Sequence, residues 1–155
     1  MIYTALLVVH SLFRWFLLIS LFYSIYQAFK GWSSKLPYTP RFDKIRNITV
    51  ILAHVQLIVG LGLYFISPVI RQLFNNFGEA VQESAIRFYG MEHSLMMIIA
   101  IVLITIGSAK AKRLSEDVKK FKSIAIWFTI GLILILITIP WPFSPFDARP
   151  LFRIF

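Results

Sequence analysis

The sequence predicts an all-α integral membrane protein whose four helices form an up-down-up-down bundle. Two observations lead to this fold class. Hydrophobic residues make up 58% of the 155 residues and charged residues only 15%, which is a far more apolar composition than that of a soluble domain. The apolar residues also gather in four blocks, each long enough to cross the hydrocarbon layer of a bilayer, which takes about 20 helical residues.

We expect the four spans at about residues 2–29, 47–67, 86–109 and 122–140. The first block is too long for the core of a secretory signal and no small-residue cleavage motif follows it, so it is expected to stay as a helix. Pro68 stops the second block and Pro140 the fourth, because proline cannot continue a helix. The blocks lack the alternation of polar and apolar residues that marks a membrane barrel. Together they predict one transmembrane domain over residues 1–155.

The segment between the second and third spans is longer than a turn requires. Four apolar residues recur in it at helical spacing, with polar residues between them: Leu73, Phe74, Phe77 and Val81. This pattern predicts a short amphipathic helix lying on the membrane surface. An ordered lid over the mouth of the bundle is the alternative that the same pattern allows.

The basic residues predict how the bundle is oriented. The net charge is +9, and of the sixteen Lys and Arg residues five lie in residues 30–46 and six in residues 110–122. The connection and tail on the other side carry only Arg71, Arg87, Arg149 and Arg153. The positive-inside rule therefore places both basic connections in the cytoplasm and both termini outside. Because an anionic membrane surface explains this basicity, nucleic acid is not expected as a partner.

Composition and motifs exclude several kinds of chemistry. The chain has no cysteine, which excludes disulfides, iron–sulfur clusters and covalent c-type haem attachment. The sequence contains no nucleophile–base motif, phosphate-binding loop or metalloprotease helix motif. We therefore expect no catalytic residue, and we expect any chemistry to be electron transfer performed by a bound cofactor.

Five ionisable residues lie inside the predicted spans: His10, Arg14, His54, Glu92 and His93. Such residues are costly at membrane depth, so they usually face the interior of a bundle and serve a site. All three histidines of the protein are among them. The fourth span is expected to contribute packing alone.

The depths of the histidines favour one pair. At a helical rise of about 1.5 Å per residue, His10 and His93 each lie roughly 24 Å from the basic end of their span, whereas His54 lies only about 13 Å up. The first and third spans occupy diagonal corners of an up-down-up-down bundle. His10 and His93 can therefore face each other across the bundle axis, as the axial ligands of a b-type haem iron do. This pair predicts one haem b, with His10 and His93 as its metal ligands.

Residues near the pair complete the expected cofactor site. Arg14 lies one turn from His10, where it could contact a haem propionate, the head group of a quinone, or Glu92 as an ion-pair partner. Glu92 is expected to tune the site or relay protons. Met97 lies one turn from His93 on the same helical face.

The same residues have plainer interpretations that the sequence leaves open. A membrane histidine can serve only as a hydrogen-bonding group between helices, and His54 suits a structural or proton-handling role better than ligation. It stays in the expected cofactor site because a His54–His93 pair could ligate if the helices tilt. Met97 could fill space in the core. Gln56 lies on a different face of its helix from His54, which hints at a partner subunit or a second pocket.

Five segments carry a family resemblance: His10–Trp15, Ala53–Leu57, Gly60–Phe65, Glu92–Met97 and Pro140–Phe143. They resemble a group of small bacterial four-span membrane proteins usually labelled cytochrome b, and the resemblance covers nearly the whole chain. It implies a haem b protein of the bacterial inner membrane in which His10, His54 and His93 are the motif histidines. It does not decide which two of them bind iron. The large respiratory cytochromes b carry two histidines on each of two helices, so three histidines here imply one haem at most.

Two classes of function follow. In the first, a b-type cytochrome-like protein passes electrons between the quinone pool and a partner protein, with haem b and also a quinone as bound groups. In the second, the chain is a non-catalytic accessory subunit whose polar core fixes packing while its surface docks into a larger inner-membrane complex or a homo-oligomer. The small size, the two polar faces of the second span and the aromatic tail from Trp141 to Phe155 are compatible with the second class.

Overall fold

The computed structural model describes residues 1–143, and these are helical apart from short connections. Its four long helices are α1 (Ile2–Ser33), α2 (Pro40–Ile66), α6 (His93–Arg113) and α7 (Asp117–Thr138). Between α2 and α6 lie α3 (Pro68–Asn75), α4 (Phe77–Ala80), α5 (Ser84–Arg87) and a π-helical turn, η1 (Phe88–Glu92). The predicted all-α bundle is confirmed. Arg149, Arg153 and most of the aromatic tail lie outside the described residues.

Four helical segments are long and apolar enough to cross a membrane: Ile2–Ser33, Pro40–Ile66, Ser84–Arg113 and Asp117–Thr138. The protein is therefore a multi-pass membrane protein. At the basic ends, the four long helices extend beyond the predicted spans. α2, for example, begins at Pro40, a residue suited to the first helical position. The two basic connections consequently shrink to residues 34–39 and 114–116, and most of their charges stand on helix ends.

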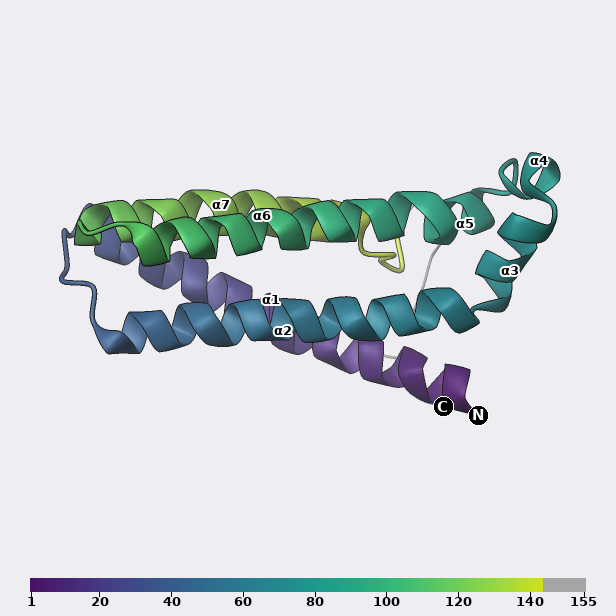
Figure 1. Ribbon diagram of the computed structural model, residues 1–155, viewed down its shortest axis with the longest axis horizontal. Coiled ribbons are helices and arrows are strands. Elements are labelled where there is room, and N and C mark those ends of the chain that lie inside the picture. Colours follow the sequence, from purple (N-terminus) through teal and green to yellow (C-terminus); the bar gives the residue numbers. More distant parts are fainter. Residues whose placement is uncertain (144–155) are drawn as a thin grey trace.

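The four long helices form a closed ring of neighbours. α1 packs against α2 and α7, α6 packs against α7, and α2 meets α6 in the least extensive of the four interfaces. α1 and α6 therefore occupy diagonal corners, as predicted. Figure 1 shows α1 crossing the bundle obliquely, so that its N-terminal end diverges from the α6–α7 pair.

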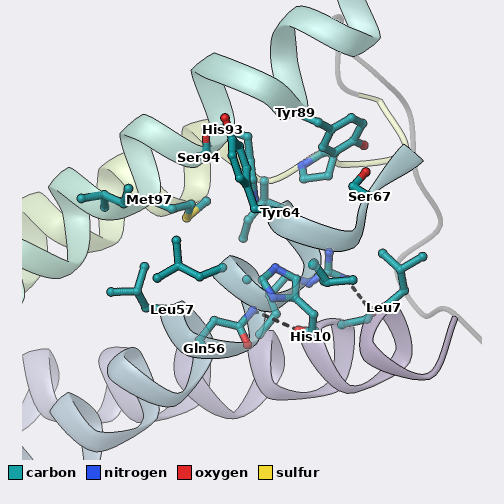
Figure 2. Close-up of a pocket in the computed structure, with 18 of the residues that line it drawn as sticks. Leu7, His10, Gln56, Leu57, Tyr64, Ser67, Tyr89, His93, Ser94 and Met97 are labelled. Carbon is teal, nitrogen blue, oxygen red and sulfur yellow. Dashed lines mark hydrogen bonds between the residues drawn. The ribbon is translucent and has the colours of Figure 1, made fainter. Parts of the chain in front are cut away.

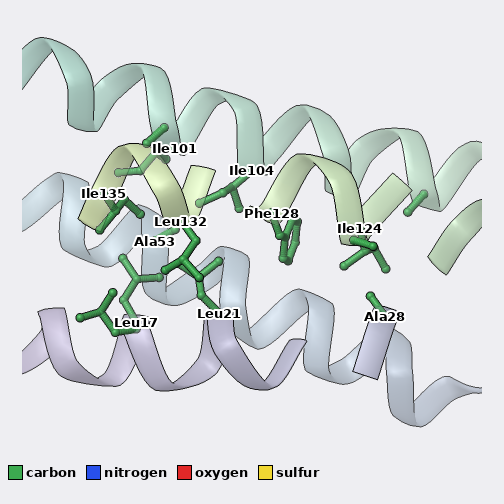
Figure 3. Close-up of a cluster of buried hydrophobic side chains, with 14 of the residues drawn as sticks. Leu17, Leu21, Ala28, Ala53, Ile101, Ile104, Ile124, Phe128, Leu132 and Ile135 are labelled. Atoms are coloured by element: carbon green, nitrogen blue, oxygen red, sulfur yellow. The ribbon is translucent and has the colours of Figure 1, made fainter. Parts of the chain in front are cut away.

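The half of the bundle beside residues 34–39 and 114–116, hereafter the connection half, is densely packed (Figure 3). Small residues let large ones approach there, as is common between membrane helices. A Cβ atom on Gly31 would come within 2.5 Å of the Phe121 ring, and one on Gly107 within 2.3 Å of Trp127. Phe128 is completely buried between these contacts and the centre of the bundle. Side-chain volume thus fills this half.

Polar side chains also join the helices of the connection half. Ser24 on α1 and Thr49 on α2 share a buried hydrogen bond of 2.6 Å. Arg46, predicted as a charge of the basic connection, is instead only 4% exposed. It donates to Asp43 at 2.8 Å and to the hydroxyl of Ser108 on α6. A buried guanidinium requires such partners, and this one ties α2 to α6.

The opposite end of the bundle is covered by α3, hereafter the lid helix. Ile70 and Leu73 are buried beneath it, and a Cβ atom on Gly90 would come within 2.4 Å of Leu73. α3 ends at Asn75 and α4 begins at Phe77. Phe74 on α3 and Phe77 on α4 are both exposed. The expected single amphipathic helix is thus broken into α3 and α4, and the lid alternative describes α3 better.

Candidate functional site

A cavity of about 220 Å³ lies beneath the lid helix, in what we call the cavity half of the bundle. For comparison, an apolar cavity of about 150 Å³ in another protein accommodates benzene. α1, α2 and α6 supply most of the walls. Its polar walls are Tyr3, His10, Ser11, Arg14, Gln56, Tyr64, Ser67, Tyr89, His93 and Ser94, and aliphatic side chains together with Met97 supply the rest.

His10 and His93 lie in the walls of this one cavity, His10 carried by α1 and His93 by α6 (Figure 2). Arg14 and Leu17 line it from the same face of α1 as His10. Met97 lines it one turn beyond His93. The structure therefore brings together four of the six residues expected at the cofactor site: His10, Arg14, His93 and Met97.

The ring of His93 is held in a defined state by α7. Its Nδ1 lies 3.0 Å from the carbonyl oxygen of Thr138. Because a carbonyl oxygen can only accept, Nδ1 must carry the proton and donate it. Neutral His93 is then left with a lone pair on Nε2. Histidines that bind metals are commonly oriented by a second hydrogen bond of this kind.

The sequence Pro140-Trp141-Pro142 explains why the Thr138 carbonyl is available. In a continuing helix, the carbonyls of Leu136 and Thr138 would accept from the amides of residues 140 and 142. Both positions are prolines and have no N–H. The Trp141 indole donates to the Leu136 oxygen at 2.8 Å, and His93 takes the Thr138 oxygen. α7, expected to contribute packing alone, therefore also orients a site residue through its backbone.

The π-helical turn η1 lies immediately before His93. Such turns change the helical hydrogen-bond pattern locally and often occur at functional sites. In η1 the carbonyl oxygen of Gly90 accepts from the Tyr64 hydroxyl at 3.0 Å, and the Ser94 hydroxyl lies 3.2 Å from the carbonyl oxygen of Met91. Tyr64 thereby links the end of α2 to the start of α6 above the cavity.

His10 is supported by α2. Its backbone carbonyl accepts a hydrogen bond of 3.0 Å from Gln56 Nε2, and its ring fits against Gly60, where a Cβ atom would lie 3.2 Å from His10 Cε1. The Nδ1 atom of His10 is buried and has no hydrogen-bond partner among the described residues, as is also true of Gln56 Oε1. Leaving such atoms unpaired costs about 1–3 kcal/mol each, so the site favours a group that pairs with them.

Arg14 reaches the cavity from α1. Its Nη2 lies 3.4 Å from the Ser11 hydroxyl and its guanidinium carbon 5.5 Å from the centroid of the Trp15 ring. Glu92, one partner expected for Arg14, forms an ion pair of 2.9 Å with Arg87. The side chain of Glu92 does not line the cavity in the part of the chain that the structure describes.

His54 lies apart from the cavity, at the interface between α2 and α6. Its Nε2 is 3.1 Å from the Thr105 hydroxyl oxygen, which itself lies 2.7 Å from the Ile101 carbonyl. The single hydroxyl proton is taken by that carbonyl, so His54 Nε2 donates. His54 faces α6 and Gln56 faces α1, so both polar faces of α2 point into this bundle. Of the two alternatives that these faces suggested, a pocket is the one that Gln56 lines, and a partner subunit stays a prediction.

Sequence reasoning missed several cavity residues. Tyr64, Tyr89 and Ser94 were not singled out, although each is a polar group within or beside an apolar span. Gln56 was noticed only as a sign of a partner subunit or a second pocket, and its place on this cavity was not foreseen. In the described residues no three His, Cys, Asp or Glu side chains gather in a group that could hold a metal ion.

No protein-family model, no curated protein and no solved structure matches this chain. The four long apolar helices are established by the structure, and no family is identified.

Proposed function

We propose that the cavity binds one haem b, with His10 and His93 as its axial ligands. The observation that carries this proposal is the pairing of two histidines, from diagonal helices, on one largely apolar cavity. The Thr138 carbonyl supports it by leaving His93 Nε2 available. The unpaired Nδ1 of His10 supports it because a ring nitrogen without a partner is present on the facing helix.

A bound haem would supply one-electron exchange with a quinone or a protein partner. The chain's own residues would hold and orient it. His10 and His93 would hold its iron, and the Arg14 guanidinium would pair with a propionate carboxylate. Leu17, Leu57 and Met97 would exclude water from the ring. Glu92 and His54 have no part in this arrangement, because their partners are Arg87 and Thr105.

The size of the cavity favours a second candidate, the ring of a quinone. Sites for drug-sized ligands usually enclose about 300–1,000 Å³, and this cavity encloses about 220 Å³. A haem would need α2 and α6 to separate further, and theirs is the least extensive interface of the ring. A quinone ring needs no such separation, and Arg14 could donate to one of its carbonyl oxygens.

An absorption spectrum of purified protein supplied with haem tests the first candidate. We expect the bands of six-coordinate low-spin haem b. His10→Ala and His93→Ala should each abolish them, because each removes an axial ligand. His54→Ala is the matched control and should keep them. Loss of the bands in His54→Ala, with retention in either of the others, would refute the ligand assignment.

Binding of a short-chain benzoquinone tests the second candidate. The cavity is a quinone site if two results are found together. The protein supplied with haem shows no low-spin haem bands, and it binds the quinone with an affinity that His93→Ala and Arg14→Gln weaken. A folded protein that binds neither group would be left with the accessory role in a larger membrane complex.

We also propose that the protein lies in the bacterial inner membrane with residues 34–39 and 114–116 on the cytoplasmic side. The basic residues beside these connections support this orientation, because the positive-inside rule applies to charges near the ends of spans. Fusing a reporter active only in the cytoplasm after Lys35 should give signal, and fusing it after Asn76 should not. The reverse pattern would overturn the orientation.

A further inference from the structure

We infer that the cavity is entered sideways, from the hydrocarbon core of the membrane, through a window between α2 and α6. The ligand it serves is then a flat, lipid-soluble molecule that exchanges directly with the bilayer. This inference rests on the proposed function only in taking the cavity as a binding site, and it holds for a haem or a quinone ring alike.

The first observation is where the cavity walls reach the surface. Leu61 on α2 and Ile98 on α6 line the cavity and are 39% and 38% exposed. The other described wall residues are buried or half-buried. Both exposed residues are aliphatic and lie within apolar spans, so the surface they reach faces lipid acyl chains. The cavity therefore comes closest to the lipid between these two helices.

The second observation is how α2 and α6 are joined. Above the cavity, the Tyr64 hydroxyl bonds the Gly90 carbonyl, and below it His54 bonds Thr105. Along α2 these two links are ten residues apart, or about 15 Å of helix. Between them, α2 and α6 present cavity walls to each other. Two polar links thus hold the helices at either end of a stretch that is otherwise closed by side chains alone.

Two other approaches, at the two ends of the cavity, are filled by described residues. The lid helix covers the end of the bundle, with Leu73 seated against Gly90. Towards the connection half, the buried side chains of Leu21, Ile104 and Phe128 fill the bundle below the cavity. A route through the window meets the exposed side chains of Leu61 and Ile98, whereas a route through either end meets the lid helix or the buried side chains of the packed core.

Labelling of a single cysteine tests the window without any need for a bound cofactor, because the native chain has no cysteine. Met97→Cys places a thiol on the cavity wall, and Ile58→Cys places one on the lipid-facing surface, where Ile58 is 68% exposed. Protein in lipid vesicles is treated with N-phenylmaleimide, which is flat and apolar, or with a sulfonated maleimide that stays in water. We expect the apolar reagent to label both thiols and the charged reagent to label neither.

Blocking variants then locate the route. Added to Met97→Cys, Leu61→Trp or Ile98→Trp should slow labelling by the apolar reagent about tenfold, because a bulky side chain fills the gap and must swing aside. Ile58→Trp and Leu95→Trp are the matched controls: they lie on the same helices, are exposed, and do not line the cavity. They should leave the rate unchanged. Circular dichroism checks that each variant is folded. Because Leu61 lies on α2 and Ile98 on α6, the test still works if one of the two blocking variants does not fold.

Three results would overturn the inference: labelling of Met97→Cys by the charged reagent at the rate of the apolar one, no labelling of it while Ile58→Cys reacts, or equal rates with and without the blocking residues. Failure of the proposed function is separate. Labelling of the Met97→Cys thiol through the window, in a protein that binds neither haem nor quinone, would support the window and refute the proposed cofactor.

Discussion

In the connection half of the bundle glycines face aromatic rings, whereas in the cavity half a glycine faces a histidine. Gly31 and Gly107 receive Phe121 and Trp127 so closely that no side chain could be added without movement. Gly60 lies against the His10 ring with slightly more space, and beyond it the cavity begins. The same helices are therefore closely packed at one end and enclose a large cavity at the other.

The difference shows how a membrane bundle can divide its tasks. Apolar side chains gain little from one another in lipid, so close packing through small residues supplies much of the association between helices. The connection half follows that rule and adds the buried Arg46 and Ser24–Thr49 links. The cavity half gives up packing, and its buried His10 Nδ1 and Gln56 Oε1 atoms lack hydrogen-bond partners among the described residues, as Tyr38 Oη and Thr129 Oγ1 do away from the cavity.

The largest effect should come from truncating a residue of the packed half. Phe128→Ala should lower the free energy of unfolding by about 3–5 kcal/mol, because Phe128 is fully buried and leaves a cavity behind. Met97→Ala should cost less than about 2 kcal/mol, since Met97 already borders empty space. Denaturant titration in detergent micelles measures both. Equal costs would mean that the two halves are packed alike.

Adding a methyl group sharpens the comparison. Gly107→Ala should cost about 1–3 kcal/mol, because the new Cβ would come within 2.3 Å of the Trp127 Cβ atom and two helices must move apart. Gly60→Ala should cost less, since it meets only the His10 ring, at 3.2 Å. Its main effect should be on ligand binding at His10. A larger loss of stability in Gly60→Ala than in Gly107→Ala would contradict this account.

The smallest effect concerns Tyr38, in the connection between α1 and α2. Burial raises the pKa of Tyr38, so the folded protein keeps its phenol proton to higher pH than the unfolded chain does. The resulting stability is fully present below the usual tyrosine pKa of about 10 and is lost as pH rises through the folded-state pKa. The midpoint of thermal unfolding should therefore fall more steeply above that pH in the native protein than in Tyr38→Phe. Lysine titration affects both proteins equally, so parallel curves would count against the prediction.

Hydropathy and helical rise were enough to predict the four spans and to bring His10 and His93 to a common depth. Both are properties of single helices, and the structure places the two histidines on the walls of one cavity. The lid was anticipated as an alternative from its apolar spacing. Its break at Asn76 and the seating of Leu73 on Gly90 depend on tertiary contacts, which no local pattern contains.

The fate of Glu92 shows where the sequence pattern was insufficient. α-Helical spacing places residues three or four apart on one face, so Arg87 was not considered as a partner. The π-helical turn Phe88–Glu92 widens the helix, and residues five apart then come together, as the Arg87–Glu92 ion pair does. His54 likewise required knowledge of which face of α2 meets Thr105, a fact set by how the helices are rotated.

The acceptor that orients His93 is a backbone atom, and this has a genetic consequence. Any substitution at position 138 changes a side chain but leaves the carbonyl in place. The orientation of His93 is therefore protected against point mutation at its own contact residue. It is vulnerable at Pro142, where a residue with an amide proton could donate to that oxygen in a longer α7, and at Pro140, where such a residue would let α7 continue that far. Sequence variation among relatives should accordingly be tolerated at the contact and restricted at the helix end.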